Sequence, residues 1–275
     1  MIPVNVSRVI CQSVSIAAPS PLKRLGSHLL APFQMPPSVL QVFLVSTIPV
    51  VAALLGAAVA ALRPPGRVVR SSIQHFAAGV IFSVVAVELL PEVRQGHDPF
   101  EVGWTFAAGV ALMLIIDAVV KRFRHDGEQG AARGPSPGQL VPIGVDVLLD
   151  GILIGIAMTT GLKQGVLLTI ALTLELFSLG LTMALEFATS KLLVRVLAPT
   201  GIACLMIVGA VLGRTLLADA SVHTLAGLLA FGCAALLFLV TEELLIEAHE
   251  SANTSVTTAM FFVGFLIFLL LGMVE

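Results

Sequence analysis

Residues 39–62 read VLQVFLVSTIPVVAALLGAAVAAL, a run of 24 residues without one charged side chain. At 1.5 Å per residue such a helix rises about 36 Å, which exceeds the roughly 30 Å hydrocarbon core of a bilayer. The following residues 63–67, RPPGR, cannot extend it, because proline lacks an amide donor and clashes with the preceding turn. This stretch therefore predicts a membrane-spanning helix that ends in a short polar loop.

Seven further apolar runs of spanning length follow it. They cover residues 72–92, 102–121, 140–161, 166–190, 194–217, 223–248 and 256–274. The whole chain of 275 residues is 57% hydrophobic and 12% charged, with a mean hydropathy of +1.02, which soluble domains do not reach. We expect an all-α membrane protein with eight transmembrane helices, in a transmembrane domain that covers residues 38–275.

Two polar segments lie outside these runs. Residues 124–138 are rich in glycine and proline, and we expect a flexible aqueous loop there that divides the helices three and five. Residues 1–37 hold several prolines and no carboxylate, a composition that is typical of a disordered or processed leader. We exclude this leader from the predicted fold.

Basic residues in the loops predict the orientation. The odd-numbered loops carry nine lysines and arginines against three in the even-numbered loops. This bias predicts odd loops in the cytoplasm and both ends of the helical array outside, in a plasma (inner) membrane. A net charge of −2 gives no reason to expect nucleic acid as a partner.

Acidic residues within or at the edge of the predicted spans carry the functional hypothesis. A carboxylate at a helix centre costs roughly 2.5 to 3.5 kcal/mol, and we expect no lysine or arginine deep enough to pair with these acids. They must then be protonated, face a water-filled cavity or bind cations, and these answers are not exclusive. The candidate metal ligands are Asp146, Asp150, Glu175, Glu88, Glu242, Glu243 and Glu247.

The spacing of three of these acids favours one site. Asp146 and Asp150 are four residues apart and share one helix face. The order of an acid followed by a glycine recurs at residues 175–180, and we expect the glycines to let the fourth and fifth helices approach closely. An all-oxygen ligand set suits manganese, iron(II), magnesium or zinc, and spacing does not choose among them.

An internal repeat links the second and seventh runs. Residues 76–92 and 231–247 each begin with a phenylalanine followed by small residues, and each ends with a Glu-Leu-Leu stretch followed by a further glutamate. With the predicted orientation they run in opposite directions, which indicates an inverted repeat with a substrate site between the halves. Shared apolar composition is the alternative explanation.

These features resemble the ZIP (Zrt/Irt-like) metal transporters over nearly the whole chain after residue 38. The second run looks like the family's second helix, in which a histidine often precedes the sequence Leu-Leu-Pro-Glu. In this chain Glu88 stands at the position of that histidine. The fourth run matches the family's His-Asn-x-Pro-Glu-Gly motif, so Asp146 falls on its metal-binding histidine and Asp150 on its metal-binding glutamate. In the fifth run Glu175 falls on the first ligand.

The seventh run matches the family's frequent His-Glu pair at Glu242 and Glu243, with Glu247 one turn later. The division into three and five helices, with both ends outside, is also a trait of the family. The chain departs from the family pattern at Val147, Leu149, Leu179 and Met206. The resemblance then implies a single carboxylate cage without imidazole, which suits a harder cation than zinc or weaker binding.

The resemblance implies a transporter that moves zinc, iron, manganese or a similar divalent cation toward the cytoplasm. The ion is the substrate, with no prosthetic group and no enzymatic activity expected. Divalent metal ions and the lipid bilayer are the expected partners, and a homodimer is left open. Two alternatives remain: a non-transporting ZIP-like metal sensor or structural subunit, and a membrane-embedded hydrolase, for which neither a His-Glu-x-x-His motif nor a nucleophile motif is present.

Overall fold

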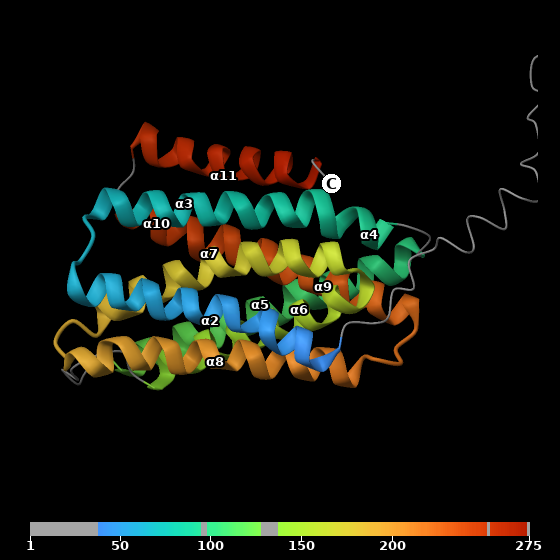
Figure 1. Cartoon of the computed structure of the whole chain (residues 1–275), viewed down its shortest axis with the longest axis horizontal. Helices are drawn as coiled ribbons and strands as arrows, with labels where there is room; N and C mark the ends of the chain where they lie inside the picture. The colour runs from blue at the N-terminus through green and yellow to red at the C-terminus, as the bar shows by residue number, and fades with distance from the viewer. Residues whose placement is uncertain (1–37, 95–97, 128–136, 252–253, 274–275) are drawn as a thin grey trace, which may run out of the picture. The chain divides into compact units, whose positions relative to one another are not determined.

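The computed structural model describes residues 38–94, 98–127, 137–251 and 254–273. Over these residues the chain is helical and contains no strand (Figure 1). The predicted leader, residues 1–37, and the centre of the predicted loop, residues 128–136, lie outside the described part.

Eight spans follow one another in chain order, and the second and seventh consist of three pieces each. They are α2 (Val39–Leu62); α3 (Arg67–Val84), η3 (Val85–Leu89) and α4 (Leu90–Arg94); α5 (Pro99–Gly127); α6 (Pro137–Thr160); α7 (Leu162–Glu186); α8 (Leu192–Leu216); α9 (Val222–Leu239), η4 (Val240–Leu244) and α10 (Leu245–Ser251); and α11 (Ser255–Met273). All eight are long and apolar enough to cross a membrane, so the predicted number of spans is confirmed.

Side-chain caps fix the starts of several spans. Ser38 Oγ accepts from the amide of Gln41, whose side chain accepts in return from the amide of Ser38, so that α2 opens on a capping box. Ser221 Oγ accepts from the amide of Thr224 at the start of α9. These bonds satisfy amide groups that the first helical turn leaves without partners.

The predicted aqueous loop is shorter in the structure than in the prediction. Helix α5 continues to Gly127, so Arg124 lies in its last turn, and α6 already begins at Pro137. The polar side chains at the end of α5 do not break a helix, and proline is well accommodated in a first turn, where no intrahelical amide bond is needed. The two helices thus extend into both ends of the predicted segment 124–138.

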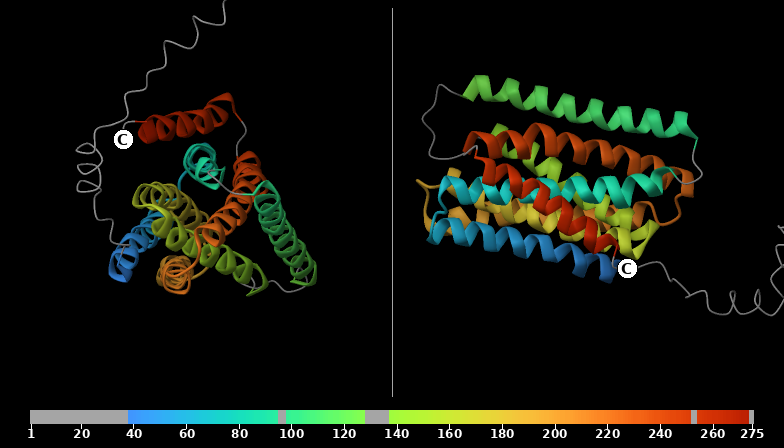
Figure 2. Two further views of the ribbon diagram at one scale, coloured as in Figure 1. Left: turned by 90° about the vertical axis from the view of Figure 1, so that its right-hand side faces the viewer. Right: turned by 90° about the horizontal axis from the view of Figure 1, so that it is seen from above.

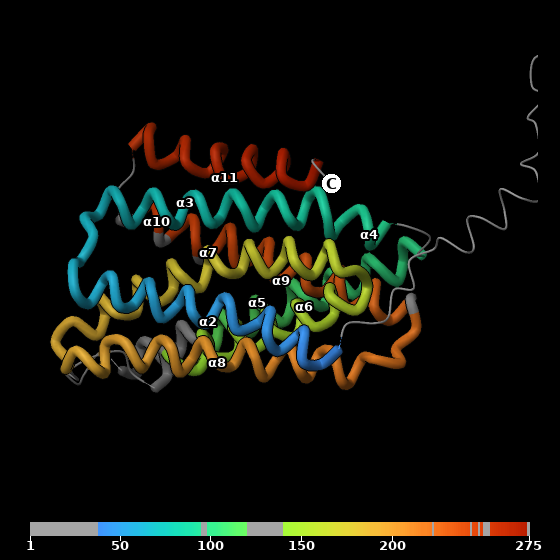
Figure 3. The backbone as a smooth tube through the Cα atoms, viewed as in Figure 1, coloured from blue at the N-terminus to red at the C-terminus, as the bar shows by residue number. Residues whose placement is uncertain are grey.

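Glycines bring the backbones of neighbouring spans together. A side chain at Gly151 of α6 would overlap the carbonyl of Met206 in α8, and one at Gly209 of α8 would overlap the carbonyl of Leu148 in α6. Small residues that allow such close approach are characteristic of helix packing in membranes. Figure 3 shows α2 and α8 running side by side, and these two helices are in contact.

The same arrangement joins α2 to α7. Gly56 of α2 lies against the carbonyl of Phe177, and Gly180 of α7 lies against the carbonyl of Ala53. The glycines that follow the acids in α6 and α7 thus contact α8 and α2. The prediction that they bring α6 and α7 together was wrong, because 100° of rotation per residue turns each glycine to another face of its helix.

The peripheral spans α5 and α11 also pack through glycines. Gly264 of α11 lies against the carbonyl of Phe76 in α3, and Gly109 of α5 lies against the carbonyl of Phe231 in α9. Figures 1 and 2 show α11 beside α3 at the edge of the bundle. Within their spans, α7 and the seventh span are the most buried, whereas α5 and α11 are the least buried.

Candidate metal centre

The hairpin of α6 and α7 sets the depth of the three central acids. The two helices are separated only by residue 161. Close to this turn Gly165 of α7 lies against Met158 of α6, and the absence of a side chain at Gly165 allows the two helices to approach closely. Asp146 lies 14 residues before the end of α6 at Thr160, and Glu175 lies 13 residues after the start of α7 at Leu162. Both acids are therefore about 20 Å along their helices from the turn, well inside the spans.

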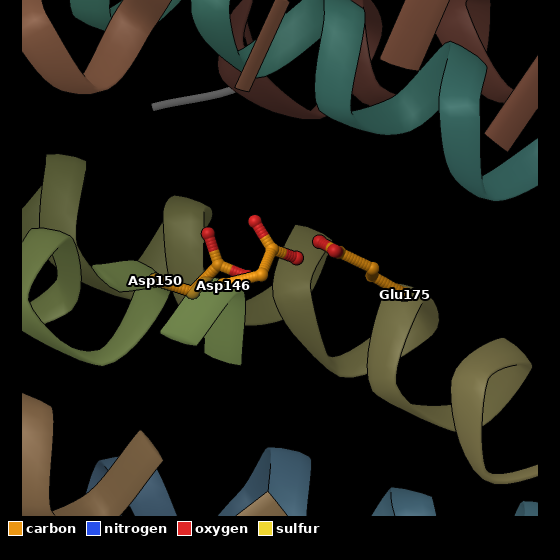
Figure 4. Close-up of side chains that lie close together, drawn as sticks. All are labelled: Asp146, Asp150 and Glu175. Atoms are coloured by element: carbon orange, nitrogen blue, oxygen red, sulfur yellow. The ribbon is translucent and has the colours of Figure 1, made fainter. Parts of the chain in front are cut away.

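At this depth the three carboxylates converge. One oxygen from each of Asp146, Asp150 and Glu175 lies within 4.8 Å of the other two. Figure 4 shows the side chains pointing toward one another from the two helices. Asp150 and Glu175 are only 3% and 5% exposed, and Asp146 is half-buried. The structure therefore brings together three of the seven predicted ligands.

The charge of this group sets its chemistry. Even at the upper limit of 4.8 Å between their oxygens, two ionised carboxylates repel each other by about 3.5 kcal/mol at an effective dielectric constant of about 20. Protons or a bound cation relieve that repulsion. Three carboxylate oxygens form a hard ligand set, which suits a divalent cation whose remaining positions are filled by water.

Two further buried polar side chains follow Glu175 in α7. Ser178 and Thr182 lie three and seven residues after Glu175, so they share its helix face, and they are 2% and 7% exposed. The predicted ligands are acids alone. The spacing of three and seven residues from Glu175 was the signal that could have found these two side chains.

Glu88 does not belong to this group. It lies in η3, its side chain is 10% exposed, and its Oε1 is 3.6 Å from Nζ of Lys163 in the first turn of α7. Lys163 also donates to the carbonyl of Gly272 near the end of α11. The expectation that no lysine reaches the intramembrane acids was therefore wrong, because a long lysine stem carries its ammonium group well past its own backbone.

The acids of the seventh span have a different setting. Glu242 lies in η4 and is exposed, outside the cluster of three. The side chains of Glu243 and Glu247 lie outside the described part of the chain. Their roles as ligands stay predictions.

Short π-helical turns mark two of these regions. Residues 85–89 of the second span and 240–244 of the seventh form η3 and η4, and they contain Glu88, Glu242 and Glu243. Such turns widen an α-helix locally and often occur at functional sites. No pattern in the sequence predicted them.

Two of the positions at which the chain departs from the pattern of the resemblance are buried and apolar. Met206 is 0% exposed and Val147 is 1% exposed. The carbonyl of Met206 lies against Gly151, one residue after Asp150.

Eight helices of spanning length and apolar composition define an integral multi-pass membrane protein of the all-α class. No protein-family model matches the chain, and no curated protein matches it. The class therefore rests on the helices of the chain itself.

Proposed function

We propose that this protein is a transporter of divalent metal cations, which pass through a site formed by Asp146, Asp150 and Glu175. The observation that carries the proposal is the convergence of three carboxylates from two adjacent spans, all within 4.8 Å and two of them almost fully buried. Ionisable residues inside a membrane are expensive and are retained where they serve a function.

An ion explains this arrangement better than packing does. Three acids at one depth cost more in a membrane than apolar residues of the same size, and the cost falls when a cation binds between them. Exchange of protons for a metal ion at these carboxylates provides the coupling in our proposal. The ligand set is all oxygen, so manganese, iron(II) or magnesium is preferred over zinc.

A ZIP-like architecture with an inverted repeat is part of the proposal. Its support is that the glycine contacts occur in matched pairs. If α2 is taken as the counterpart of α8, and α6 as the counterpart of α7, each contact in one half has an equivalent in the other half. The contact of Gly56 with the carbonyl of Phe177 then corresponds to that of Gly209 with Leu148, and the contact of Gly180 with Ala53 corresponds to that of Gly151 with Met206.

The remaining four spans give the same kind of support. When the second span is exchanged with the seventh and α5 with α11, the contact of Gly264 with Phe76 corresponds to that of Gly109 with Phe231, and η3 corresponds to η4. Inverted repeats of this type place a substrate site between the halves and permit alternating access. In our proposal the three-plus-five division, with odd loops in the cytoplasm, directs the ion inward.

Uptake into sealed vesicles tests the proposal. Purified protein reconstituted in liposomes is expected to take up Mn²⁺ or Fe²⁺ in preference to Zn²⁺. Glu175→Gln and Asp150→Asn are expected to lower the uptake rate at sub-saturating metal about tenfold or more, which corresponds to about 1.4 kcal/mol of lost binding. The matched control is Glu186→Gln, an exposed acid at the end of the same helix α7, which should keep normal uptake.

Two outcomes separate the alternatives. Metal binding by calorimetry without uptake indicates the non-transporting sensor or structural subunit. Equal uptake by the Glu175 variant and the Glu186 control contradicts the assignment of the site.

A further inference from the structure

A second group of potential ligands lies between α3 and α10, away from the carboxylate cluster. The rings of His75 and His249 have their centroids 5.0 Å apart and are tilted by 56°. His75 is 1% exposed, whereas His249 is exposed. Neither histidine belongs to the set of acids that the sequence analysis proposes as metal ligands.

The hydrogen bonds of both rings settle their tautomers. Nδ1 of His75 lies 2.8 Å from the carbonyl oxygen of Ser71, and Nδ1 of His249 lies 2.6 Å from the carbonyl oxygen of Leu245. A carbonyl only accepts, so each Nδ1 carries the proton and donates. In the neutral imidazole each Nε2 then keeps its lone pair, and Nε2 of His75 is buried without a hydrogen bond among the described residues.

This is the arrangement that metal-binding histidines adopt. A ligating imidazole nearly always donates its other ring N–H to a carbonyl or carboxylate, which orients the ring and fixes its tautomer. Here two neighbouring rings both do so, each to the carbonyl four residues earlier in its own helix. Packing alone does not require this coincidence.

The separation of the rings also fits one shared ion. A tetrahedral ion about 2.0–2.1 Å from each Nε2 holds the two ring centroids about 5.2 Å apart. The observed separation is 5.0 Å. The centroid separation is therefore compatible with both rings binding a single ion.

The backbone around the pair is held in place, and His249 borders an open cavity. Ser71 Oγ donates to the carbonyl of Ala248 at 2.9 Å, which ties α3 to α10 beside the two rings. An open cavity of about 490 Å³ lies against His249 and is also lined by Thr241, Leu245 and Ile246. This volume accommodates an ion with water molecules as its remaining ligands.

We propose that His75 and His249 form a second binding site, specific for a divalent cation that prefers imidazole, such as Zn²⁺, Co²⁺ or Ni²⁺. Imidazole nitrogen is a softer ligand than carboxylate oxygen, so this site selects a different group of ions from the cluster in α6 and α7. The proposal does not rest on the transport function, because it concerns other residues and another ligand type.

Co²⁺ titration of the full-length protein tests the pair. The variants are made in a background of Asp146→Asn and Asp150→Asn, which removes the carboxylate cluster as a competing site. This background protein is expected to bind about one equivalent of Co²⁺ with a visible absorption spectrum typical of nitrogen ligands. His249→Gln is expected to weaken that binding about tenfold or more, and His75→Gln combined with His249→Gln should abolish it.

The matched control is His223→Gln, an exposed histidine at the start of α9, which should leave the titration unchanged. His249 is exposed, so its replacement is tolerated by the fold even where replacement of the buried His75 is not, and this single variant then decides the question. Co²⁺ affinity and spectrum identical in the His249→Gln and His223→Gln proteins overturn the proposal. A vesicle assay without uptake overturns only the transport function.

Discussion

At the scale of single residues, Glu88 shows how a partner changes the meaning of an acid in a membrane. By position in its span, Glu88 resembles Glu175, since both are acids within apolar runs. Lys163 makes the difference, because its ammonium group lies 3.6 Å from Glu88 and also donates to the end of α11. Glu88 therefore forms an ion pair that links two spans in this structure, whereas Glu175 is a member of a carboxylate cluster.

Replacing Lys163 with methionine is expected to destabilise the protein. The carboxylate of Glu88 would keep its 10% exposure and lose its cation, at a cost of about 1–2 kcal/mol after allowing for the 37% exposure of the lysine. We expect a melting temperature lower by about 2–5 °C in detergent. Circular dichroism or scanning fluorimetry measures this shift.

Lys191→Met is the control, since Lys191 is exposed and its side chain makes no cap bond at the start of α8. Adding Glu88→Gln to Lys163→Met should recover part of the loss, because the uncompensated charge is then gone. Equal melting temperatures for the Lys163 and Lys191 variants would show that the ion pair contributes nothing to stability.

At the scale of helices, glycines determine which spans touch. Gly151 and Gly209 face each other's helices across α6 and α8, and Gly56 and Gly180 do the same across α2 and α7. In lipid no hydrophobic force drives helices together, so close backbone packing supplies much of the attraction. The two helices that carry the acids are thus packed closely against neighbours, α6 against α8 and α7 against α2. This packing holds the acids in position.

Gly151→Ala is expected to separate α6 from α8. The added methyl would overlap the carbonyl of Met206, a backbone atom that cannot move aside alone. Overpacking of this kind costs about 1–3 kcal/mol, and it also shifts Asp150, the preceding residue. Thermal unfolding in detergent and metal titration measure the two effects.

Gly201→Ala provides the comparison, because a side chain at this exposed position of α8 meets nothing within 4 Å. There the exchange should be neutral or stabilising by up to about 1 kcal/mol, as alanine is the better helix former. A melting temperature of the Gly151 variant at or above that of the Gly201 variant would contradict the packing explanation.

At the scale of the whole molecule, α8 separates two loops of opposite predicted location. The guanidinium group of Arg195 donates to the carbonyls of Ala184 and Ala60, and it so joins the ends of α7 and α2 to the start of α8. A cation at helix C-termini is stabilised by the helix dipoles. The start of α8 thus lies at the same end of the bundle as the ends of α2 and α7.

Cysteine labelling tests this orientation. In a background with all three native cysteines replaced by alanine, Thr189→Cys precedes α8 and Asp219→Cys follows it, and both positions are exposed. We expect a membrane-impermeant maleimide to label Asp219→Cys in intact cells and Thr189→Cys only after permeabilisation. Labelling of both positions from the same side would show that α8 does not span the membrane, and the reverse pattern would overturn the orientation.

The sequence alone determined the class of the protein and the approximate bounds of its spans. Hydropathy, helix length and the positions of proline are local properties, so each apolar run could be read without knowing its neighbours. The same holds for Asp146 and Asp150, because a spacing of four residues on a helix places two side chains on one face. Their meeting with Glu175 followed from the short turn between α6 and α7.

Only the tertiary structure decided which faces meet. Helix rotation and tilt, which local patterns do not specify, turned Gly151 to α8 and Gly180 to α2, brought Lys163 to Glu88, and placed His75 beside His249. Each of these contacts joins segments far apart in the chain, and its energy depends on how several helices pack at once. The composition of a span therefore indicates that it crosses the membrane, and its packing decides what each polar residue within it does.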